Sequence, residues 1–535
     1  MSTKPCLPLL SFPISATRSW VSRFRTSNSR PPASVAVVIC RKPEPPRRSS
    51  RNGTGCSADL EEPKTNEGRH VSFRQPITAE RNRPPTLELM PIVHEHHQRN
   101  RSRSAALTSE YQKYDAQSDP QRKGMRDQTA TAVKACRVCQ SRRLDEILSL
   151  GNQYVSDFVA SDGNNPQAPL ELVRCVNCGL VQLRHTFSRE NLYRHYWYRS
   201  GISPTMRKAL ADLVSGTCEI AKPGPGEMAV DVGCNDGTLL RSYKVPGLFR
   251  VGFEPARNLV PDAMKGTDWV FNDFFSARTL EQKFGERKAR IVTSIAMFYD
   301  LEDPNSFVAD VAKILAPNGV WVVQQNYLVT MLEQNGYDNI GHEHLEYYSL
   351  GTMQRLMWRH GLEVFEVETN DVNGGSFRTF ICHKGQYTIG KRVTNMEKRE
   401  ARLALSEHAT YQRFAENIRR IGSQVREFII GEVGRGKVVY VYGASNRGNT
   451  ILQYCGLDRT LIKKAADANP EKWDRKTVGT LIPIVSKEEA RKDKPDYFLI
   501  LPHHFLKEIR NDEKEYLESG GKFIVPLPEF RIVAN

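Results

Sequence analysis

The chain has 535 residues, of which 39% are hydrophobic and 26% are charged, and it is therefore too long for one ordinary domain. Its net charge of +15 comes mostly from residues 1–130, which carry 22 Lys and Arg against 12 Asp and Glu, so the distribution argues against a general nucleic-acid-binding surface. The longest apolar runs, such as residues 34–40, are far shorter than the roughly 20 residues of a membrane span, and 11 cysteines, an odd number, favour a reduced, intracellular setting such as the cytoplasm.

Residues 1–130 are predicted to form a disordered basic tail. They hold 14 of the 30 prolines and show no sustained helical or strand periodicity. Such a segment cannot bury enough apolar surface to offset the entropy of ordering. The first acidic residue is Glu44, and the Ser- and Arg-rich composition before it is typical of an organellar transit peptide. A solvated tail or a mistaken gene start gives the same pattern, and the nearby His94, His96 and His97 are not expected to bind a metal.

Residues 131–200 are predicted to form a zinc-binding module. Cys136 and Cys139 form one C-x-x-C pair, and Cys175 and Cys178 form another. Each pair supplies two thiolates from one tight turn, and four thiolates complete the closed tetrahedral site of a structural zinc ion. The 35 residues between the pairs predict a small folded insert, and its weakly basic composition argues against nucleic-acid binding.

Residues 201–390 are predicted to form a cofactor-binding core. The run AVDVGCNDGTLL at residues 229–240 places D-x-G-x-x-x-G between a strand and the start of a helix. Glycines at such a turn let the backbone approach a ligand closely, whereas neither a dinucleotide fingerprint nor a P-loop is present. An acidic strand end suits a ligand with an amino-acid moiety, because Asp231 or Asp236 can pair with its ammonium group.

Further acids follow in the order expected of a doubly wound fold. A second strand ends at Glu254, where a carboxylate can bind both ribose hydroxyls. Asp273 and Phe274 then offer an acid and an aromatic face for a purine. Strands near residues 291–295 and 319–324 alternate with helices, which predicts a parallel sheet. The candidate cofactor-binding residues are Asp231, Gly233, Asn235, Asp236, Gly237, Glu254, Asp273 and Phe274.

This pattern resembles the class I S-adenosylmethionine-dependent methyltransferases. Over residues 133–535 the chain is similar to the sugar-nucleotide C-methyltransferases of deoxysugar biosynthesis, which combine a four-cysteine zinc module, a methyltransferase core and a C-terminal Rossmann-like domain. The matching stretches are CVNCGLVQ (175–182), YRSGIS (198–203), the loop at 231–240, HEH (342–344), GGSFR (374–378) and YGASNRGNT (442–450). The resemblance implies S-adenosyl-L-methionine and a structural zinc ion as cofactors.

The run HEHLEYY at residues 342–348 is the candidate catalytic segment. Its histidines are two residues apart, so they share a face only in an extended segment, and an H-E-x-x-H zinc helix is excluded. They could help to bind a metal, or the run could be a polar turn. The functional interpretation is a general base that removes a proton next to a ketone. The resemblance implies that Glu343 and His344 belong to the active site, with His344 as the base.

The sequence departs from the sugar enzymes at three positions. They usually carry a tyrosine just before H-E-H, where this chain has Gly341. They usually carry an asparagine and a histidine after the fourth core strand, where the nearest alignment gives Ala296 and Asp300. These changes leave the cofactor site intact but bear on the acceptor and the mechanism. Tyr198 or Tyr299 could supply the missing phenol, so the catalytic candidates are His344, Glu343, His342, Tyr198 and Tyr299.

The remaining residues are predicted to form a helical connector at 391–432 and a second, smaller Rossmann-like domain at 433–535. Its glycine loop after the strand at 437–443 suits an anion at a helix N-terminus, or it is a plain strand-to-helix turn. The resemblance implies that this loop binds the diphosphate of a nucleotide-sugar. The substrate-binding candidates are Ser376, Arg378, Gly443, Ala444, Asn446, Arg447 and Gly448.

We therefore expect an α/β enzyme that methylates carbon in a nucleotide-linked keto-sugar or a similar small molecule through an enolate. An O- or N-methyltransferase of another small metabolite would use the same cofactor core. A protein of a different class, a non-catalytic zinc and Rossmann binding protein that uses its tail on nucleic acid, is disfavoured by the intact series of Asp231, Glu254 and Asp273.

Overall fold

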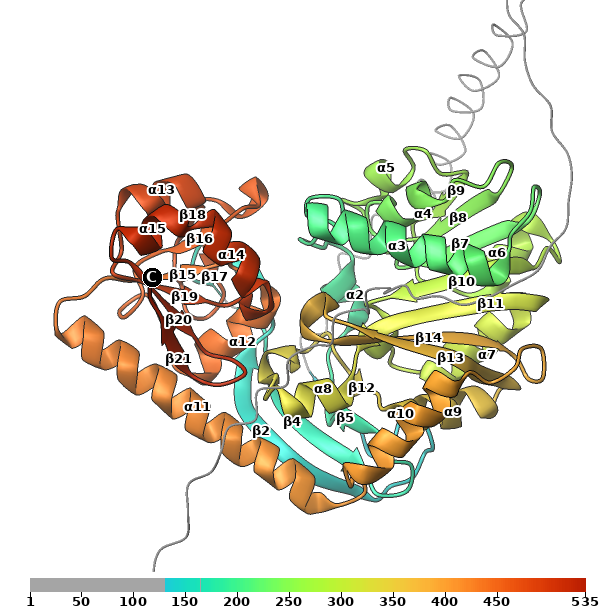
Figure 1. Ribbon diagram of the computed structural model, residues 1–535, viewed down its shortest axis with the longest axis horizontal. Helices are drawn as coiled ribbons and strands as arrows, with labels where there is room; N and C mark the ends of the chain where they lie inside the picture. Colours follow the sequence, from blue (N-terminus) through green and yellow to red (C-terminus); the bar gives the residue numbers. More distant parts are fainter. Residues whose placement is uncertain (1–129, 164) are drawn as a thin grey trace, which may run out of the picture. The chain divides into compact units, whose positions relative to one another are not determined.

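The computed structural model describes residues 130–163 and 165–535, and the expectations for residues 1–129 lie outside this range. Within it, the predicted fold class is confirmed: a cysteine-rich module, a seven-stranded α/β core and a six-stranded α/β domain follow one another along the chain (Figure 1). No helix in these ranges combines the length and the apolar character that crossing a bilayer requires.

The N-terminal module is built on an antiparallel sheet with the order β12-β5-β4-β2. Its strands are β2 (Leu144–Tyr154), β4 (Gln167–Cys175), β5 (Val181–Leu183) and β12 (Glu346–Tyr347). The folded insert expected between the cysteine pairs is thus β2, β3 (Phe158–Val159) and β4. Two-residue strands complete the module: β1 (Thr131–Ala132) pairs with β6 (His185–Thr186), and β3 pairs with β17 (Lys476–Thr477). The helix α2 (Arg189–Tyr193) ends it.

The core sheet has the order β13-β14-β11-β10-β7-β8-β9. The strands are β7 (Met228–Val232), β8 (Phe249–Phe253), β9 (Trp269–Phe271), β10 (Ala289–Ile295), β11 (Leu315–Asn326), β13 (Leu362–Asn370) and β14 (Ser376–His383). All neighbours are parallel except β14, which runs antiparallel to both β11 and β13. Because β7 begins in the middle and the chain then builds outward on both sides, the carboxyl end of β7 lies at a topological switch point, where such sheets bind ligands.

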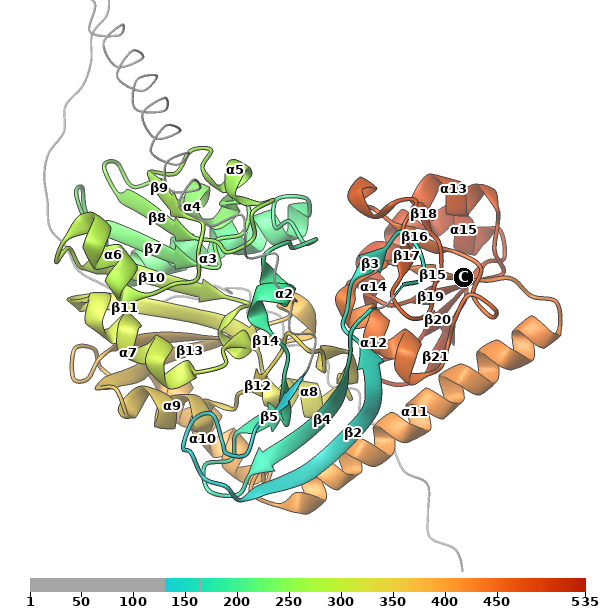
Figure 2. The ribbon, with the colours of Figure 1, turned by 180° about the vertical axis from the view of Figure 1, so that it is seen from behind.

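Helices cover both faces of this sheet. One face packs on α3 (Pro204–Ala221), α4 (Thr238–Ser242) and α5 (Val260–Ala263), and the other on α6 (Ala277–Phe284), α7 (Pro304–Ile314) and α9 (Leu350–Trp358). The helix α3 is in front of the sheet in Figure 1, and α6 and α7 are in front of it in Figure 2. A separate hydrophobic core lies on each face of the sheet. Alternate residues of β7 point into different cores: Ala229 packs in the first, with α3, α4 and α5, and Val230 packs in the second, with α6, α7 and α9.

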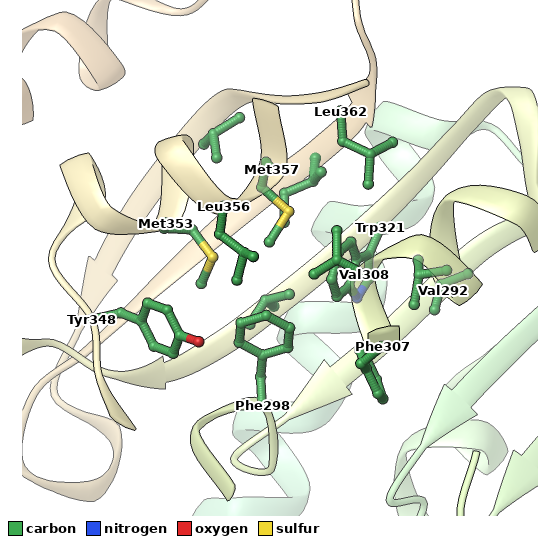
Figure 3. Packing of buried hydrophobic residues seen from close by; sticks show 14 of the residues in the cluster. Val292, Phe298, Phe307, Val308, Trp321, Tyr348, Met353, Leu356, Met357 and Leu362 are labelled. Carbon is green, nitrogen blue, oxygen red and sulfur yellow. The ribbon is translucent and has the colours of Figure 1, made fainter. Parts of the chain in front are cut away.

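Figure 3 shows the second of these cores, in which Phe298 and Phe307 pack on Trp321, and Tyr348 lies beside Met353. Phe298 begins the 3-10 turn η1 (Phe298–Asp300), which directly follows β10, and Tyr348 follows the candidate catalytic segment. Their rings are 5.4 Å apart between centroids. Two segments that line the site described below are therefore anchored in one hydrophobic core.

Two helices connect the core to the C-terminal domain. They are α10 (Lys391–Arg402) and α11 (His408–Gly434), and together they fall where the sequence predicts a helical connector. The buried residues of α11 recur every three or four positions, as in Tyr411, Phe414, Ile418 and Ile421, and they join one core with residues of β2 and β4. Figure 2 shows α11 alongside these two strands.

The C-terminal domain has a sheet of order β18-β16-β15-β19-β20-β21, parallel except for its last strand. Its strands are β15 (Val439–Tyr442), β16 (Ala465–Asp467), β18 (Ile484–Ser486), β19 (Tyr497–Ile500), β20 (Lys522–Val525) and β21 (Arg531–Val533). Its helices are α12 (Asn446–Tyr454), α13 (Lys487–Lys492), α14 (Leu506–Asp512) and α15 (Lys514–Glu518).

Short helices also occur in both α/β domains. The core contains α8 (Leu328–Glu333), η2 (Tyr337–Asn339) and η3 (Val372–Gly374), and the C-terminal domain contains η4 (Pro470–Lys472) and η5 (His503–Phe505).

Candidate functional site

The four cysteines predicted to bind zinc converge on one point. Their sulfur atoms all lie within 4.8 Å of one another. Cys136 Sγ is 3.4 Å from Cys178 Sγ, and Cys139 Sγ is 3.5 Å from Cys175 Sγ. Zinc–sulfur bonds of about 2.3 Å in a tetrahedron place the sulfurs about 3.8 Å apart, so this geometry fits a closed four-thiolate site. The cofactor is a structural zinc ion, because four cysteine sulfurs fill its tetrahedral coordination and leave no open position for catalysis.

The zinc module also holds the candidate catalytic segment in place. The strand β12 pairs with β5 through Glu346 opposite Gln182, and the Leu183 amide donates to the Leu345 carbonyl at 2.9 Å. His342 Nε2 lies 2.9 Å from the Ala168 carbonyl on β4. Residues 342–347 are thus bound to the module at three points, although they belong to the methyltransferase core in sequence. A local change in the module therefore moves the segment.

The cofactor loop follows β7 and has the backbone that its glycines predict. Gly233 has φ +72° and Gly237 has φ +77°. A Cβ atom on Gly233 would lie 3.1 Å from Met297 Cγ, and one on Gly237 would lie 2.8 Å from the Ala263 carbonyl oxygen. Both positions therefore require glycine, and the first one keeps the backbone open to the cavity.

Two buried carboxyl groups stand at the ends of neighbouring strands beside this loop. Asp231 on β7 accepts a hydrogen bond of 2.6 Å from Thr293 Oγ1. Glu254, just after β8, accepts from the amides of Asn235 at 2.7 Å and Ala256 at 2.8 Å. Burial raises the pKa of each carboxyl to about 7. They lie where an ammonium group and ribose hydroxyls would offset that burial, which is the donor set of S-adenosylmethionine.

The other predicted cofactor residues differ in their surroundings. Asp236 does not line the cavity. Its carboxylate accepts from the Gly201 amide at 2.7 Å and from the hydroxyl of Thr238 at 2.6 Å, and these hydrogen bonds stabilise the loop on the side away from the cavity. Asp273 and Phe274 do line it. The guanidinium groups of Arg189 and Arg194 make cation–π contacts with Phe274, at 4.4 and 4.7 Å from its ring centre. A purine that stacks on Phe274 would therefore contact a ring that already interacts with two cations.

One cavity of about 540 Å³ joins the cofactor loop to the candidate catalytic segment. Its cofactor end is formed by the loop after β7 and by Glu254, and its far end by Glu343, His344 and residues of the C-terminal domain. The aromatic run YRHYWY at residues 193–198 covers one side, and Tyr198 remains 45% exposed there. The cofactor and an acceptor can therefore meet in one cavity.

His344 faces this cavity with its tautomer fixed. Its Nδ1 lies 2.6 Å from the Asn339 carbonyl, which can only accept, so Nδ1 carries the proton and Nε2 is left with a free electron pair. Burial lowers the pKa of His344, which keeps the ring neutral. The Tyr299 ring packs edge-on at 4.5 Å. His342 Nε2 contacts the Ala168 carbonyl, and the residue does not line this cavity, although it lines a smaller pocket together with His344.

The positions that depart from the sugar enzymes also lie at the site. Ala296, with φ +54°, and Asp300 both line the cavity. A Cβ on Gly341 would meet no heavy atom of the described residues within 4 Å, so the space that a larger residue would occupy at this position is open. The chain thus lacks a phenol at this point, and Tyr299 lines the cavity with its ring against that of His344.

The glycine loop of the C-terminal domain is used mainly for packing. A Cβ on Gly443 would lie 2.7 Å from Pro502, and one on Gly448 would lie 2.5 Å from Leu501. The Gly448 amide already donates to the N-cap hydroxyl of Ser445 at 3.0 Å, and the Ala444 carbonyl accepts from Lys472 at 2.7 Å. These contacts are those of a strand-to-helix turn.

The predicted substrate-binding side chains fall into two groups. Asn446, Arg447 and Ser376 line the cavity, but Arg378 does not, because it bonds to Gln324 and Glu368 in the sheet. Asn446 Nδ2 donates to Glu343 at 3.1 Å. The side chains of the C-terminal loop thus contact the methyltransferase core directly.

Several lining residues were not predicted from the sequence. The run containing Tyr193 and Tyr196 is conspicuously aromatic, and that signal could have been used. Lys472 and His504 come from turns after β16 and β19 and carry no local signal. Their only clue is position, because loops at the carboxyl ends of parallel strands gather ligands.

Comparison with known proteins gives a consistent result. Family models match residues 136–193 as a zinc-binding domain, 204–367 as a methyltransferase domain and 371–528 as a C-methyltransferase C-terminal domain. The C-methyltransferase NovU of Streptomyces niveus is 33% identical over 408 residues, which cover 75% of this chain and 97% of that protein.

Solved methyltransferases resemble the chain over about a third of its length. One from Clostridium acetobutylicum ATCC 824, which is S-adenosylmethionine-dependent, has 12% identity and a TM-score of 0.27, and it covers 34% of this chain and 92% of its own. The magnesium protoporphyrin IX methyltransferase ChlM of Synechocystis PCC 6803, solved with bound S-adenosylmethionine, has 10% identity and a TM-score of 0.26, covering 33% and 78%.

Proposed function

The chain belongs to the family of S-adenosylmethionine-dependent C-methyltransferases with an N-terminal zinc-binding module, and we propose that its acceptor is a nucleotide-linked keto-sugar or a similar small ketone. The observation that carries the proposal is His344, a neutral imidazole with a free Nε2 on the wall of the cofactor cavity. Methylation of carbon requires removal of a carbon-bound proton, and a base of this kind supplies it.

Each residue has a distinct task in the proposed reaction. Bound S-adenosylmethionine supplies an electrophilic methyl group, and the residues of the chain make the acceptor carbon nucleophilic. His344 Nε2 takes a proton from the carbon next to the ketone, and the electron pair left behind delocalises onto the carbonyl oxygen as an enolate. Asp231 and Glu254 hold the cofactor by its ammonium and ribose groups. Holding the carbon and the methyl group in near-attack geometry accounts for most of the acceleration.

The far wall of the cavity supports a nucleotide-linked acceptor. Lys472, whose side chain is 13% exposed, places an ammonium group there that pairs with Asp467 at 3.5 Å and could also contact a phosphate. Asp467 lines the same wall at the carboxyl end of β16, the position at which doubly wound folds bind ribose hydroxyls. Glu343, held by Asn446, lies between this wall and His344.

The test is to incubate the full-length protein with methyl-labelled S-adenosylmethionine and a panel of keto-sugar nucleotides, and to locate the label by NMR. The proposal requires a new methyl carbon bonded to the carbon next to the ketone. A label on oxygen or nitrogen, or turnover only of ketone-free acceptors, would exclude it. The matched non-keto sugar nucleotides serve as controls and should remain unlabelled.

A further inference from the structure

Asp300 is a cavity residue whose carboxyl group has no evident structural task. It ends η1, directly after Tyr299, and it lines the cavity that holds His344. Its Oδ1 is enclosed and has no hydrogen-bond partner among the described residues. The Tyr299 carbonyl accepts from the Leu345 amide at 2.8 Å, which fixes η1 against the catalytic segment. An enclosed, unpaired carboxylate oxygen is costly, so the geometry favours a neutral carboxylic acid.

Ionisable groups surround Asp300 on every packed element. They are Tyr193 of α2, Tyr196 of the segment after it, Tyr299 of η1, Glu343 of the catalytic segment, and Glu346 and Tyr347 of β12. None of them is a cation. Burial first, and then the carboxyl groups of Glu343 and Glu346, raise the pKa of Asp300 well above its usual range.

Glu343 is the neighbour that could compete for the proton. Its two carboxylate oxygens accept from Asn446 Nδ2 at 3.1 and 3.4 Å. Asp300 Oδ1 has no such donor. Of these two carboxyl groups, only Asp300 has an enclosed oxygen without a hydrogen-bond donor among the described residues.

The nearby phenols are poorer acids. Burial raises the pKa of Tyr193 and Tyr299 well above the usual range. The Tyr193 hydroxyl is already engaged, because it donates to the Glu343 carbonyl at 2.9 Å. Among these groups, Asp300 combines an enclosed, unpaired carboxyl oxygen with a place on the cavity wall.

We propose that Asp300 is a catalytic general acid that protonates the acceptor's carbonyl oxygen while His344 removes the proton from the adjacent carbon; this rests on the proposed keto acceptor. The C–H electron pair becomes a C=C bond, and the carbonyl π pair forms the new O–H bond with the proton of Asp300, which leaves Asp300 as a carboxylate. The C=C electron pair then bonds to the methyl group of the bound cofactor, whose carbon–sulfur bond would break with its pair left on sulfur, and the enol O–H proton returns to Asp300. The proton left on His344 is the one released to water.

The first test is spectroscopic and needs no acceptor. Infrared difference spectra of the full-length protein, with and without ¹³C-labelled aspartate, should show the C=O stretch of a protonated carboxyl group at pH 8. That band should vanish in Asp300→Asn and persist in Glu302→Gln, the control carboxyl group two residues away. Absence of the band in the wild-type protein would overturn the proposal, whether or not the variant folds.

The second test measures exchange of the α-proton of keto-sugar nucleotides in D₂O by NMR. Asp300→Asn should slow exchange by about 10²-fold or more, while Glu286→Gln, at an exposed carboxyl group outside the cavity, should exchange like wild type. The wild-type rate should fall at high pH as Asp300 ionises. Glu343→Gln should move that fall to lower pH, because it removes a negative charge that raises the pKa of Asp300.

The two tests separate the acid role from the proposed function. Exchange in the wild-type protein that survives unchanged in Asp300→Asn would overturn the acid role alone. A wild-type protein that exchanges no α-proton of any ketone, yet methylates an acceptor, would overturn the keto acceptor and the acid role with it. Binding of S-adenosylmethionine to Asp300→Asn, measured by calorimetry, should stay near the wild-type value, which shows that the variant is folded.

Discussion

Arg447 and Asp338 form a buried ion pair between the C-terminal domain and the methyltransferase core. Arg447 Nε and Nη2 lie 2.9 and 2.5 Å from Asp338 Oδ2, and the Asp338 side chain is 1% exposed. His503 Nε2 approaches the same oxygen at 3.3 Å. Burial opposes ionisation of Asp338, but Arg447 and His503 together hold its pKa below the usual range. The arginine expected to bind a diphosphate is thus held by a carboxylate.

Removing one member of this pair should strongly destabilise the protein. Arg447→Met leaves the Asp338 carboxylate buried without its cation, and we expect a loss of about 3–5 kcal/mol in the free energy of unfolding by urea. The double variant with Asp338→Leu should recover part of the loss. The exposed pair of Lys208 and Asp212 is the control, because Lys208→Met should cost less than about 1 kcal/mol. Equal losses of unfolding free energy in Arg447→Met and Lys208→Met would contradict the conclusion that the pair of Arg447 and Asp338 is buried.

Loss of zinc should affect catalysis as well as stability. The protein should contain one zinc per four-cysteine site, and Cys175→Ser should lose metal and unfold at a lower temperature. Since β12 pairs with β5, the catalytic segment should then lose order before the cofactor loop does. Hydrogen exchange should show increased exchange at residues 342–347 and little change at 231–237. Uniform exchange across both segments would contradict this coupling.

The cofactor loop should not tolerate a side chain at Gly233. Its φ of +72° disfavours other residues, and a Cβ would lie 3.1 Å from Met297. We expect Gly233→Val to abolish detectable binding of S-adenosylmethionine in isothermal titration. Gly216→Ala, in α3 and with no described heavy atom within 4 Å of the new Cβ, should bind normally. Normal binding by Gly233→Val would remove the loop from the site.

His342 should make the fold sensitive to acid. Burial lowers its pKa to about 4, below the ordinary value of about 6.5. As pH falls, His342 is therefore protonated in the unfolded chain before it is protonated in the folded protein. The free energy of unfolding should then decrease between about pH 6.5 and pH 4, by up to about 3 kcal/mol. Urea unfolding of His342→Gln should show a shallower decline in this window. The exposed His408→Gln should follow the wild-type curve, and an unchanged curve for His342→Gln would refute the assignment.

His344 should matter for turnover and not for cofactor binding. His344→Ala removes the free Nε2, and we expect turnover to fall by about 10²-fold or more while calorimetric affinity for S-adenosylmethionine stays nearly unchanged. His342→Ala, whose ring faces away from the cavity, should lower turnover less. If His344→Ala turns over normally and Tyr299→Phe or Tyr198→Phe does not, the base lies elsewhere and transfer to a heteroatom becomes the better explanation.

The sequence by itself determined the parts whose chemistry is local. Two C-x-x-C pairs predict a zinc site because each knuckle is set by four consecutive residues, and the loop at 231–237 predicts its own backbone because glycine alone adopts those angles readily. The alternation of strands and helices, with an acid after each of the first two core strands, likewise predicts the core and its ligand edge.

Only the tertiary structure decided which polar groups face one another. The spacing of His342 and His344 permits a shared face, but pairing of β12 with β5 turns one ring toward Ala168 and leaves the other in the cavity. The partner of Arg447 is 109 residues away in the chain, and no local pattern encodes that distance. The raised pKa of Asp300 depends on enclosure by segments far apart in sequence, because burial and neighbouring charge are properties of the packed molecule.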